Sequence, residues 1–459
     1  MPSEKTLSGK LLVFAMVISA FITAGASELN DLKLKAKTDK ENPIGYKVGE
    51  TIRFDFFLDG VKELPDEAAA KSPLKVEWTR TGDDGVKATG IEEISLEKGC
   101  SIETKLDMPG IVRIEAQLIG FDGSKFESIK RSYLEKGILF SGGAGVEPEK
   151  MQLTTNEPAD FDEFWNEAKA KLATVPVKAK LTDVTPEKLK GKYRVCAVEI
   201  DCFGPRPATG WLTMPADAKE KSLPAKALFH GYNGNNFQQP KIPEHGFGDF
   251  ISLEINAHGY EMTGHDEQYY KDYGNKVNGI APGAPARASY ALACADYDNP
   301  KDTYFYYMAM RVMRAFDYLK SLPEWDGKNL MAEGGSQGGL QTMWAAGLVD
   351  GLSEARPRIT WGCDIGCPFD GKGPFPSRVW GIPSVPGAFY FDSALHAKRV
   401  PSTCRVEITR LGLGDYTCPP RGVLLSYYNL KGPAKANLVQ GATHGYVPPM
   451  PNQTFVISK

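Results

Sequence analysis

Apolar and polar residues alternate in short runs through the first third of the chain. The run from Lys47 to Leu58 follows the two-residue period of a half-exposed strand, and Leu74–Thr79 and Gly110–Ile119 repeat this period. Residues that favour turns separate the runs, among them Gly82–Gly85 and Pro109. The pattern predicts short antiparallel strands joined by tight turns.

This pattern extends over residues 27–138 and predicts a separate all-β domain. About seven short strands of this kind are typical of a small immunoglobulin-like β-sandwich. The segment has no histidine and no cluster of residue types used in catalysis. We therefore expect a spacer or packing module, with carbohydrate binding as the alternative, followed by a linker at Ser141–Gly145.

From residue 139 to 459, predicted strands alternate with predicted helices. The clearest elements are helices at Phe161–Leu172, Thr303–Leu319 and Gln337–Leu348, and strands at Ala225–His230 and Leu330–Glu333. Alternation of this kind predicts a mostly parallel, doubly wound sheet with helices on both faces. We expect this second domain to carry the chemistry.

The N-terminus has the pattern of an export signal. Lys5 and Lys10 precede the apolar run Leu11–Ile22, and Ala24–Ala26 offers a small-residue cleavage site. A membrane-spanning helix needs about 20 apolar residues, so this run is short for an anchor, and no later stretch is apolar enough to span a membrane. We expect a signal peptide over residues 1–26 and a secreted or periplasmic protein, with an uncleaved anchor as the alternative.

Composition excludes some functions. The 459 residues include 54 basic and 57 acidic ones, a net charge of −3, which argues against a nucleic-acid-binding protein. Export would permit disulfides among the eight cysteines, but their pairing is not deducible. Cys363 and Cys367 are a weak zinc candidate because no second pair of ligands has suitable spacing. We expect neither a metal nor a cofactor.

The segment Gly334–Gly338 (GGSQG) fits the G-x-S-x-G pattern, with an apolar strand before it and a small-residue helix after it. Such a turn is so tight that side chains two positions before or after the serine would clash, which explains the glycines. Together, pattern and context predict an α/β-hydrolase fold with Ser336 as the nucleophile.

A serine nucleophile needs a histidine to take its proton, and in this fold the histidine comes last in the chain. Of six histidines, only His396 and His444 follow Ser336. His444 lies in a glycine-containing loop after a predicted strand, where catalytic residues of open α/β sheets are found. His396 lies in a helix-like stretch, where a surface position is the ordinary explanation, so we favour His444.

The acid of the triad must lie between the serine and the histidine. Asp415 follows the strand-like run Val406–Leu413, and its position after Gly414 favours it. The rivals are Asp364, Asp370 and Asp392. Of these, Asp392 has the position of a helix cap.

Hydrolysis of an acyl group also needs two N–H donors for the tetrahedral oxyanion. One should be the amide of Gln337, directly after the nucleophile. The second should come from the loop His230–Gly234, which resembles the HGGG-type loop of esterases, with Tyr232 as the donor. We expect His230 to brace this loop rather than to act in catalysis.

Several of these segments together resemble one family. They are Phe161–Trp165 (FDEFW), His230–Tyr232 (HGY), Gly334–Gly339 (GGSQGG), Tyr390–Asp392 (YFD) and Gly412–Pro420 (GLGDYTCPP). They look like the acetyl xylan esterase / cephalosporin C deacetylase family, carbohydrate esterase family 7. The resemblance covers the chain from about residue 147 to its end.

The resemblance implies a triad of Ser336, Asp415 and His444, with Tyr232 and Gln337 forming the oxyanion hole. It also implies removal of acetyl groups from xylo-oligosaccharides and similar small acetylated compounds, without a metal. Members of the family form ring-like hexamers, but the added β domain could block such packing, which leaves a homo-oligomer open.

Two of the family's motifs are changed in this chain. Its RGQG motif is Asn256–Gly259 (NAHG), and its HE pair is His444 and Gly445. Neither change removes a member of the triad, but both affect the expected wall of the substrate pocket. The acyl and alcohol specificity is therefore open.

Three functions follow from these patterns. The first is a secreted esterase acting on an acetylated carbohydrate. The second is another acyl hydrolase of the same fold, such as a glucuronoyl esterase or a peptidase. The third is a non-catalytic carbohydrate-binding protein, which the intact set of triad candidates disfavours.

The export signal gives the first prediction. The mature protein should begin near Ser27 and be recovered outside the cytoplasm, because Leu11–Ile22 has the length of a cleaved signal rather than of an anchor. Mass spectrometry of the native N-terminus measures this directly. Detection of peptides from residues 1–10 in the mature protein would contradict the prediction.

Overall fold

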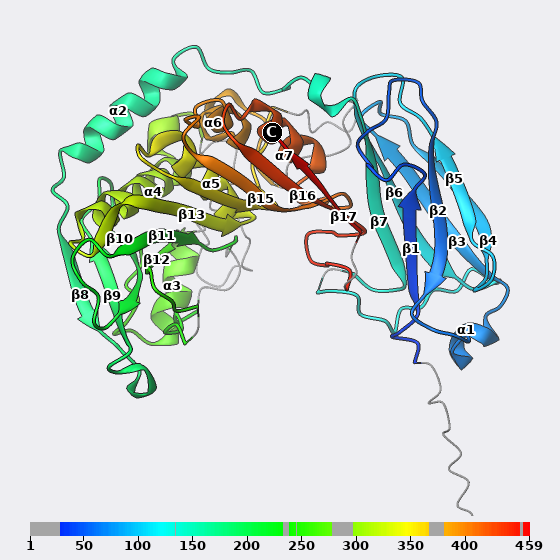
Figure 1. Ribbon diagram of the computed structural model, residues 1–459, viewed down its shortest axis with the longest axis horizontal. Coiled ribbons are helices and arrows are strands. Elements are labelled where there is room, and N and C mark those ends of the chain that lie inside the picture. Colours follow the sequence, from blue (N-terminus) through cyan, green and yellow to red (C-terminus); the bar gives the residue numbers. More distant parts are fainter. Residues whose placement is uncertain are drawn as a thin grey trace, which may run out of the picture.

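A computed structural model describes residues 28–133, 135–232, 238–244, 246–277, 297–366, 381–449 and 453–459. The expected signal peptide lies outside these residues, as do His245, Cys294, Cys367 and Asp370. The described chain has two parts: an N-terminal β region and a larger region built on one mixed sheet (Figure 1).

The N-terminal β region consists of two antiparallel sheets with the strand orders β1-β2-β5 and β4-β3-β6-β7. Alternate residues of β1 and β2 are buried between the sheets, and the rings of Phe56 and Phe140 meet edge to face across this core at 5.3 Å. The predicted β-sandwich is thus present. Its elements are β1 (Lys33–Thr38), β2 (Ile52–Asp59), α1 (Asp66–Ala70), β3 (Leu74–Gly82), β4 (Ala88–Ile94), β5 (Cys100–Thr104), β6 (Gly110–Ile119) and β7 (Leu139–Val146).

The predicted linker at Ser141–Gly145 is wrong, because this segment belongs to β7 and pairs with β6 along its length. Its glycines serve close packing. A Cβ atom on Gly143 would lie 2.7 Å from the carbonyl oxygen of Val112 and 3.0 Å from that of Leu413. The first oxygen belongs to β6 and the second to the larger region, so β7 lies between the two parts and the β region extends to Val146.

The larger region is built on a ten-stranded sheet with the order β17-β16-β15-β14-β13-β11-β12-β10-β9-β8. Strands β11 to β16 are parallel, and antiparallel strands extend both ends. The strands are β8 (Ala179–Asp183), β9 (Tyr193–Ile200), β10 (Ala208–Pro215), β11 (Leu223–Phe229), β12 (Ile251–Asn256), β13 (Trp325–Gly335), β14 (Glu354–Arg358), β15 (Arg405–Gly412), β16 (Ala434–Gln440) and β17 (Gln453–Ser458).

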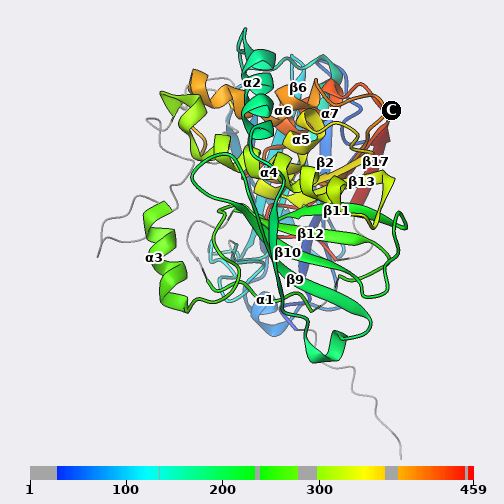
Figure 2. The same cartoon turned by 90° about the vertical axis from the view of Figure 1, so that its left-hand side faces the viewer.

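Helices cover both faces of this sheet, as predicted. Leu212 of β10 faces a core shared with helix α4, whereas Trp211 faces a second, smaller core that includes Tyr270 of helix α3. Figures 1 and 2 both show α3 apart from helices α4 to α7. The helices are α2 (Phe161–Ala173), α3 (Glu267–Val277), α4 (Tyr304–Ser321), α5 (Gln337–Leu348), α6 (Ser393–Ala397) and α7 (Pro420–Asn429), with short 3₁₀ turns η1 (Pro148–Lys150), η2 (Glu187–Leu189), η4 (Pro300–Asp302) and η5 (Pro386–Phe391).

Buried polar contacts join the two parts. The guanidinium of Arg421 on α7 lies 3.5 Å from a carboxylate oxygen of Asp83 in the β region and 3.4 Å from one of Asp364. Gln440, at the end of β16, both donates to and accepts from the backbone of Gly143. The β region therefore lies against the loops that follow the parallel strands. No helix among the described residues is long and apolar enough to cross a bilayer.

Candidate active site

Ser336 lies in the sharp turn between β13 and α5. Its φ of 59° and ψ of −117° are a strained combination for a residue with a side chain. A Cβ on Gly338 would lie 2.1 Å from the carbonyl oxygen of Phe229, and one on Gly334 would lie 2.5 Å from the carbonyl oxygen of Gly338. The glycines of the G-x-S-x-G pattern are thus required for the turn that presents Ser336.

The structure brings Ser336, His444 and Asp415 together in one line of hydrogen bonds. The Ser336 Oγ lies 3.1 Å from Nε2 of His444, and Nδ1 of His444 lies 3.0 Å from Oδ2 of Asp415. Asp415 follows β15 and His444 follows β16. Because these neighbouring strands are parallel, the loops after them meet at one edge of the sheet.

The backbone of its own loop fixes the orientation of Asp415. Its Oδ1 accepts hydrogen bonds from the amides of Thr417 at 2.8 Å and Cys418 at 2.9 Å, which leaves Oδ2 to His444. The residue is 1% exposed. A carboxylate held in this way keeps the imidazole in the tautomer with hydrogen on Nδ1, so that Nε2 can accept the serine proton.

Of the rival acids, Asp364 and Asp392 have structural roles. Asp392 is the N-cap of α6 and accepts from the amide of Ala394 at 2.7 Å, as its sequence position indicated. It also accepts from the hydroxyl of Thr155 and the amide of Ile365. Asp364 lies against Arg421 at 3.4 Å. Neither residue is hydrogen-bonded to His444.

The predicted surface position of His396 is wrong. Its side chain is 0% exposed and lies edge to face against the rings of Phe161 and Trp165. The cause is tertiary: all five residues of α6 are buried, so this short helix has no solvent face. Burial lowers the pKa of His396 to about 3, so the ring is neutral at pH 7.

The predicted oxyanion donors lie next to the serine turn. Gln337 is the first residue of α5, where backbone N–H groups have no acceptor within the helix and form the positive end of its dipole. Tyr232 follows β11 in a loop that approaches the serine turn, because a Cβ on Gly231 would lie 3.7 Å from the carbonyl oxygen of Gly335. Nε2 of His230 accepts from the amide of Ala257 at 3.0 Å, the bracing contact expected of it.

Three side chains at the site also form a cluster of possible metal ligands. Ligand atoms of Asp415, Cys418 and His444 lie within 4.8 Å of one another. Burial, with Asp415 nearby, raises the pKa of the Cys418 thiol well above its usual value, so the thiolate that zinc prefers is disfavoured. The His444–Asp415 hydrogen bond also engages the nitrogen that faces the acid. These residues therefore suit a triad better than a metal.

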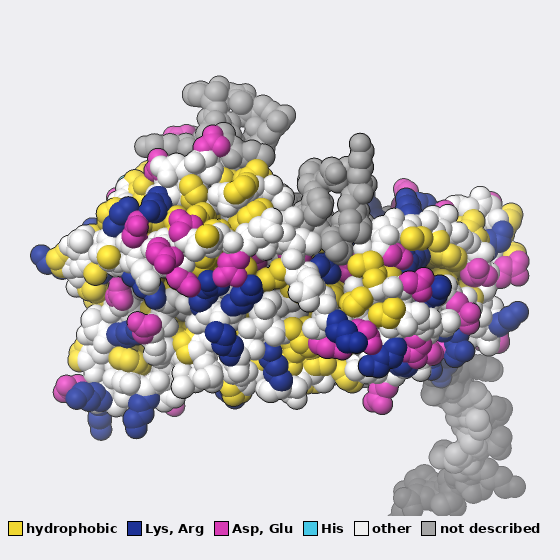
Figure 3. All heavy atoms as spheres, turned by 90° about the horizontal axis from the view of Figure 1, so that it is seen from above, with side chains coloured by type: hydrophobic (Ala, Val, Ile, Leu, Met, Phe, Trp, Pro, Cys, Tyr) yellow, Lys and Arg dark blue, Asp and Glu magenta, His cyan; other side chains and the backbone are white. Residues whose placement is uncertain are grey.

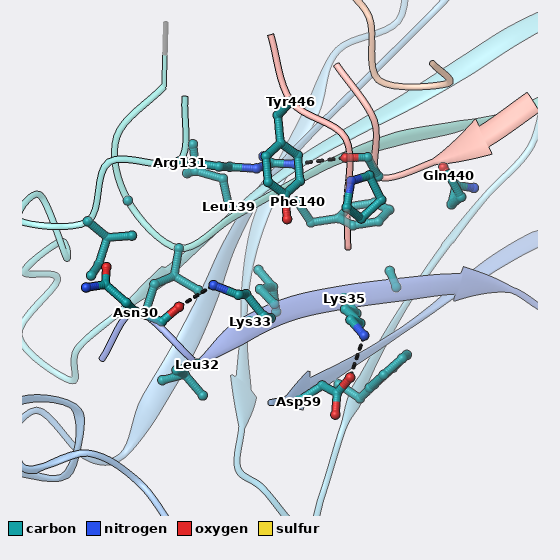
Figure 4. Close-up of a pocket in the computed structure, with 18 of the residues that line it drawn as sticks. Asn30, Leu32, Lys33, Lys35, Asp59, Arg131, Leu139, Phe140, Gln440 and Tyr446 are labelled. Carbon is teal, nitrogen blue, oxygen red and sulfur yellow. Dashed lines mark hydrogen bonds and ion pairs between the residues drawn. The ribbon is translucent and has the colours of Figure 1, made fainter. Parts of the chain in front are cut away.

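The N-terminal β region contacts both triad loops, which no motif in the sequence indicated. Arg131 donates to the carbonyl oxygen of Gly441 at 2.9 Å, and its guanidinium lies 4.1 Å from the ring centre of Tyr446 (Figure 4). Both partners belong to the loop that carries His444. Near Asp415, the guanidinium of Arg113 lies 3.2 Å from the ring centre of Tyr416.

The glycine after His444 takes part in this contact. A Cβ on Gly445 would lie 3.0 Å from Cε1 of Tyr133 and 3.2 Å from Oγ of Ser132, both in the β region. A longer side chain here would press against these two side chains, of which Tyr133 is 72% exposed and can move aside. The change from HE to His444 and Gly445 therefore lies where the added domain meets the His444 loop.

The sheet is mostly parallel, with β12 inserted between β10 and β11. The serine turn follows β13, and the acid and the histidine follow later strands. These features define an α/β-hydrolase fold. Comparison with known proteins narrows this class. Residues 149–366 match the sequence model of the acetyl xylan esterase family (AXE1). Over these residues the chain is similar to acetyl xylan esterases, and the protein is a carboxylic ester hydrolase.

Individual proteins similar to this chain include one curated relative and two solved structures. The acetyl esterase Axe7A of Xylanibacter ruminicola is 27% identical over 424 residues, which cover 82% of this chain and 78% of that protein. Among solved structures, an acetyl xylan esterase from Paenibacillus sp. R4 is 25% identical, with a TM-score of 0.49 over 65% of this chain and 93% of that one. Acetyl xylan esterase 1 from Thermoanaerobacterium sp. JW/SL YS485 is 18% identical, with a TM-score of 0.49 over 66% and 93%.

The hydrogen-bonded line predicts that Ser336, His444 and Asp415 act as one unit. Asp415→Asn should lower kcat by roughly 10³–10⁴, because the imidazole loses the acceptor that sets its tautomer. Ser336→Ala should lower kcat by about 10⁶, and adding Asp415→Asn to it should cost almost nothing further. Steady-state ester hydrolysis measures all three variants. Asp392→Asn is the comparison: if it inactivates the enzyme while Asp415→Asn does not, the assigned acid is wrong.

The support from the β region predicts an effect of a residue outside the triad. Arg131→Met keeps the apolar stem but removes the bond to Gly441, so the His444 loop should shift and kcat should fall about tenfold or more. The exposed Arg53→Met in the same region is the matched control and should leave kcat unchanged. Equal kcat values for the two folded variants would show that the contact does not position His444.

Proposed function

We propose that the protein is a serine esterase that removes acetyl groups from acetylated xylan or xylo-oligosaccharides through an acyl-enzyme. The observation that carries the proposal is the line from Ser336 through His444 to Asp415, with spacings of 3.1 and 3.0 Å. The family of residues 149–366 and the acetyl esterase relative support an acetyl group as the acyl part of the substrate.

The geometry supports a two-step reaction. In the first step, the Ser336 Oγ bonds to the acetyl carbonyl carbon while Nε2 of His444 takes the serine proton. The amides of Gln337 and Tyr232 donate to the oxyanion. His444 then gives its proton to the departing sugar oxygen, which leaves as an alcohol, and the acetyl group stays on Ser336.

In the second step, a water molecule is the nucleophile and Ser336 is the leaving group. Nε2 of His444 takes a proton from the water as its oxygen bonds to the acetyl carbon. Collapse of the intermediate breaks the bond to Ser336, whose Oγ recovers a proton from His444, and acetate leaves. Asp415 stabilises the imidazolium that forms in each step, and its two backbone donors keep it in place.

The surface is compatible with a neutral carbohydrate chain. Basic and acidic side chains are interspersed on the face seen from above (Figure 3), and the net charge of the chain is −3. An uncharged polymer needs no broad field of one sign to bind. We also propose that the enzyme works outside the cytoplasm, where such polymers occur, on the basis of the signal-like residues 1–26.

The length of the acyl chain in the substrate tests the proposed acetyl specificity. The protein should hydrolyse p-nitrophenyl acetate. For p-nitrophenyl esters with longer acyl chains, kcat/KM should fall at least about tenfold with each added carbon at first, since a pocket for an acetyl group must be enlarged to admit more carbons. Release of p-nitrophenol is the measurement. EDTA should leave the rate unchanged. A preference for long acyl chains would favour another acyl hydrolase of this fold, and no hydrolysis at all would favour a binding protein.

A further inference from the structure

A cavity of about 380 Å³ lies between the N-terminal β region and the loop that carries His444 (Figure 4). One wall is the edge strand β1 with residues 129–131 and 137–140 of the same region. The other wall consists of residues 440–448, including Gly441, Tyr446 and Pro448. Its volume is within the range of small-molecule sites, and both parts of the protein are needed to form it.

The cavity has a local excess of positive charge. Four basic residues line it, Lys33, Lys35, Lys130 and Arg131, against a single acid, Asp59. Lys35 is paired with Asp59 at 2.5 Å, and Arg131 lies 3.7 Å from Glu135. Lys33 donates to the backbone carbonyl of Asn30 and Lys130 is exposed, and neither forms an ion pair with any acid in the part of the chain that the structure describes. In a chain of net charge −3, such an excess points to an anionic ligand.

The rest of the lining suits a sugar ring. The apolar side chains of Ile129, Leu139 and Phe140 and the ring of Tyr446 border the cavity, and the amide side chain of Asn30 lies at its edge. Sugar rings combine apolar C–H faces with polar edges, so they are bound by aromatic surfaces next to hydrogen-bonding groups. A simple inorganic anion would need no such apolar wall.

We propose that this cavity is a subsite for a uronic acid carried by the same polysaccharide whose acetyl group reaches Ser336. The carboxylate would lie toward Lys33 and Lys130, and the sugar ring would pack against Tyr446 and Leu139. The cavity and the catalytic centre share one loop, since Gly441 and Tyr446 line the cavity and lie within three residues of His444 in the sequence. The inference rests on the proposed function and defines its substrate as an acetylated, uronic-acid-bearing xylan.

Binding to the inactive Ser336→Ala enzyme tests the subsite, because Ser336 does not line the cavity. Isothermal titration compares a xylo-oligosaccharide that carries one glucuronic acid with a neutral one of the same length. The charged chain should bind about tenfold more tightly, the effect expected of hydrogen bonds to a charged group. Adding Lys33→Gln and Lys130→Gln should abolish the preference. Lys37→Gln, an exposed lysine of β1 outside the cavity, is the matched control and should retain it.

Each other result counts against the subsite. Equal affinity for the two chains, or a preference that survives Lys33→Gln with Lys130→Gln in a protein of unchanged melting temperature, would overturn it. Free glucuronate bound as tightly as the charged oligosaccharide would also overturn it, since the cavity would then hold a small anion rather than part of the substrate. Hydrolysis of p-nitrophenyl acetate by the unmodified enzyme is measured in parallel: its absence refutes the proposed function, whereas the binding preference alone decides the subsite.

Discussion

The structure depends on the parallel pairing of β13, β14, β15 and β16. Parallel strands end at the same edge of a sheet, so the serine turn after β13 and the loops after β15 and β16 meet although 108 residues separate Ser336 from His444. The strained backbone of Ser336 is tolerated because β13 and α5 hold it from both sides and glycines admit the close approach of β11. The serine is reactive because the sheet places an ordinary histidine and an ordinary aspartate next to it.

The parts of the site that were predicted from sequence are those with local signals. Ser336 could be identified because its turn needs glycines at fixed positions, and His444 because only two histidines follow the serine. Asp415 and Asp392 were distinguished by their positions after a strand and before a helix. The structure places all four where these local rules indicate.

The errors arose where distant contacts decide the structure. Ser141–Gly145 has the composition of a linker, yet its glycines allow a strand to lie between two domains. His396 has the sequence context of a surface helix, yet α6 is buried on all sides. Likewise, nothing local to Arg131 or Arg113 indicates that their partners lie about three hundred residues further along the chain. Long-range packing of this kind cannot be deduced from one sequence.

The bridge that Arg421 makes between Asp83 and Asp364 has a consequence for how the molecule unfolds. All three charged groups are buried, and removing the N-terminal region would take Asp83 away from Arg421 and expose the face beneath it, leaving Asp364 and the carbonyl oxygen of Gln152 in contact with the guanidinium. Removing one partner of a buried ion pair costs several kcal/mol, comparable with a large share of a typical domain's stability. The two parts should therefore melt in a single cooperative transition, and a shortened catalytic region would not be a smaller enzyme but an unstable one.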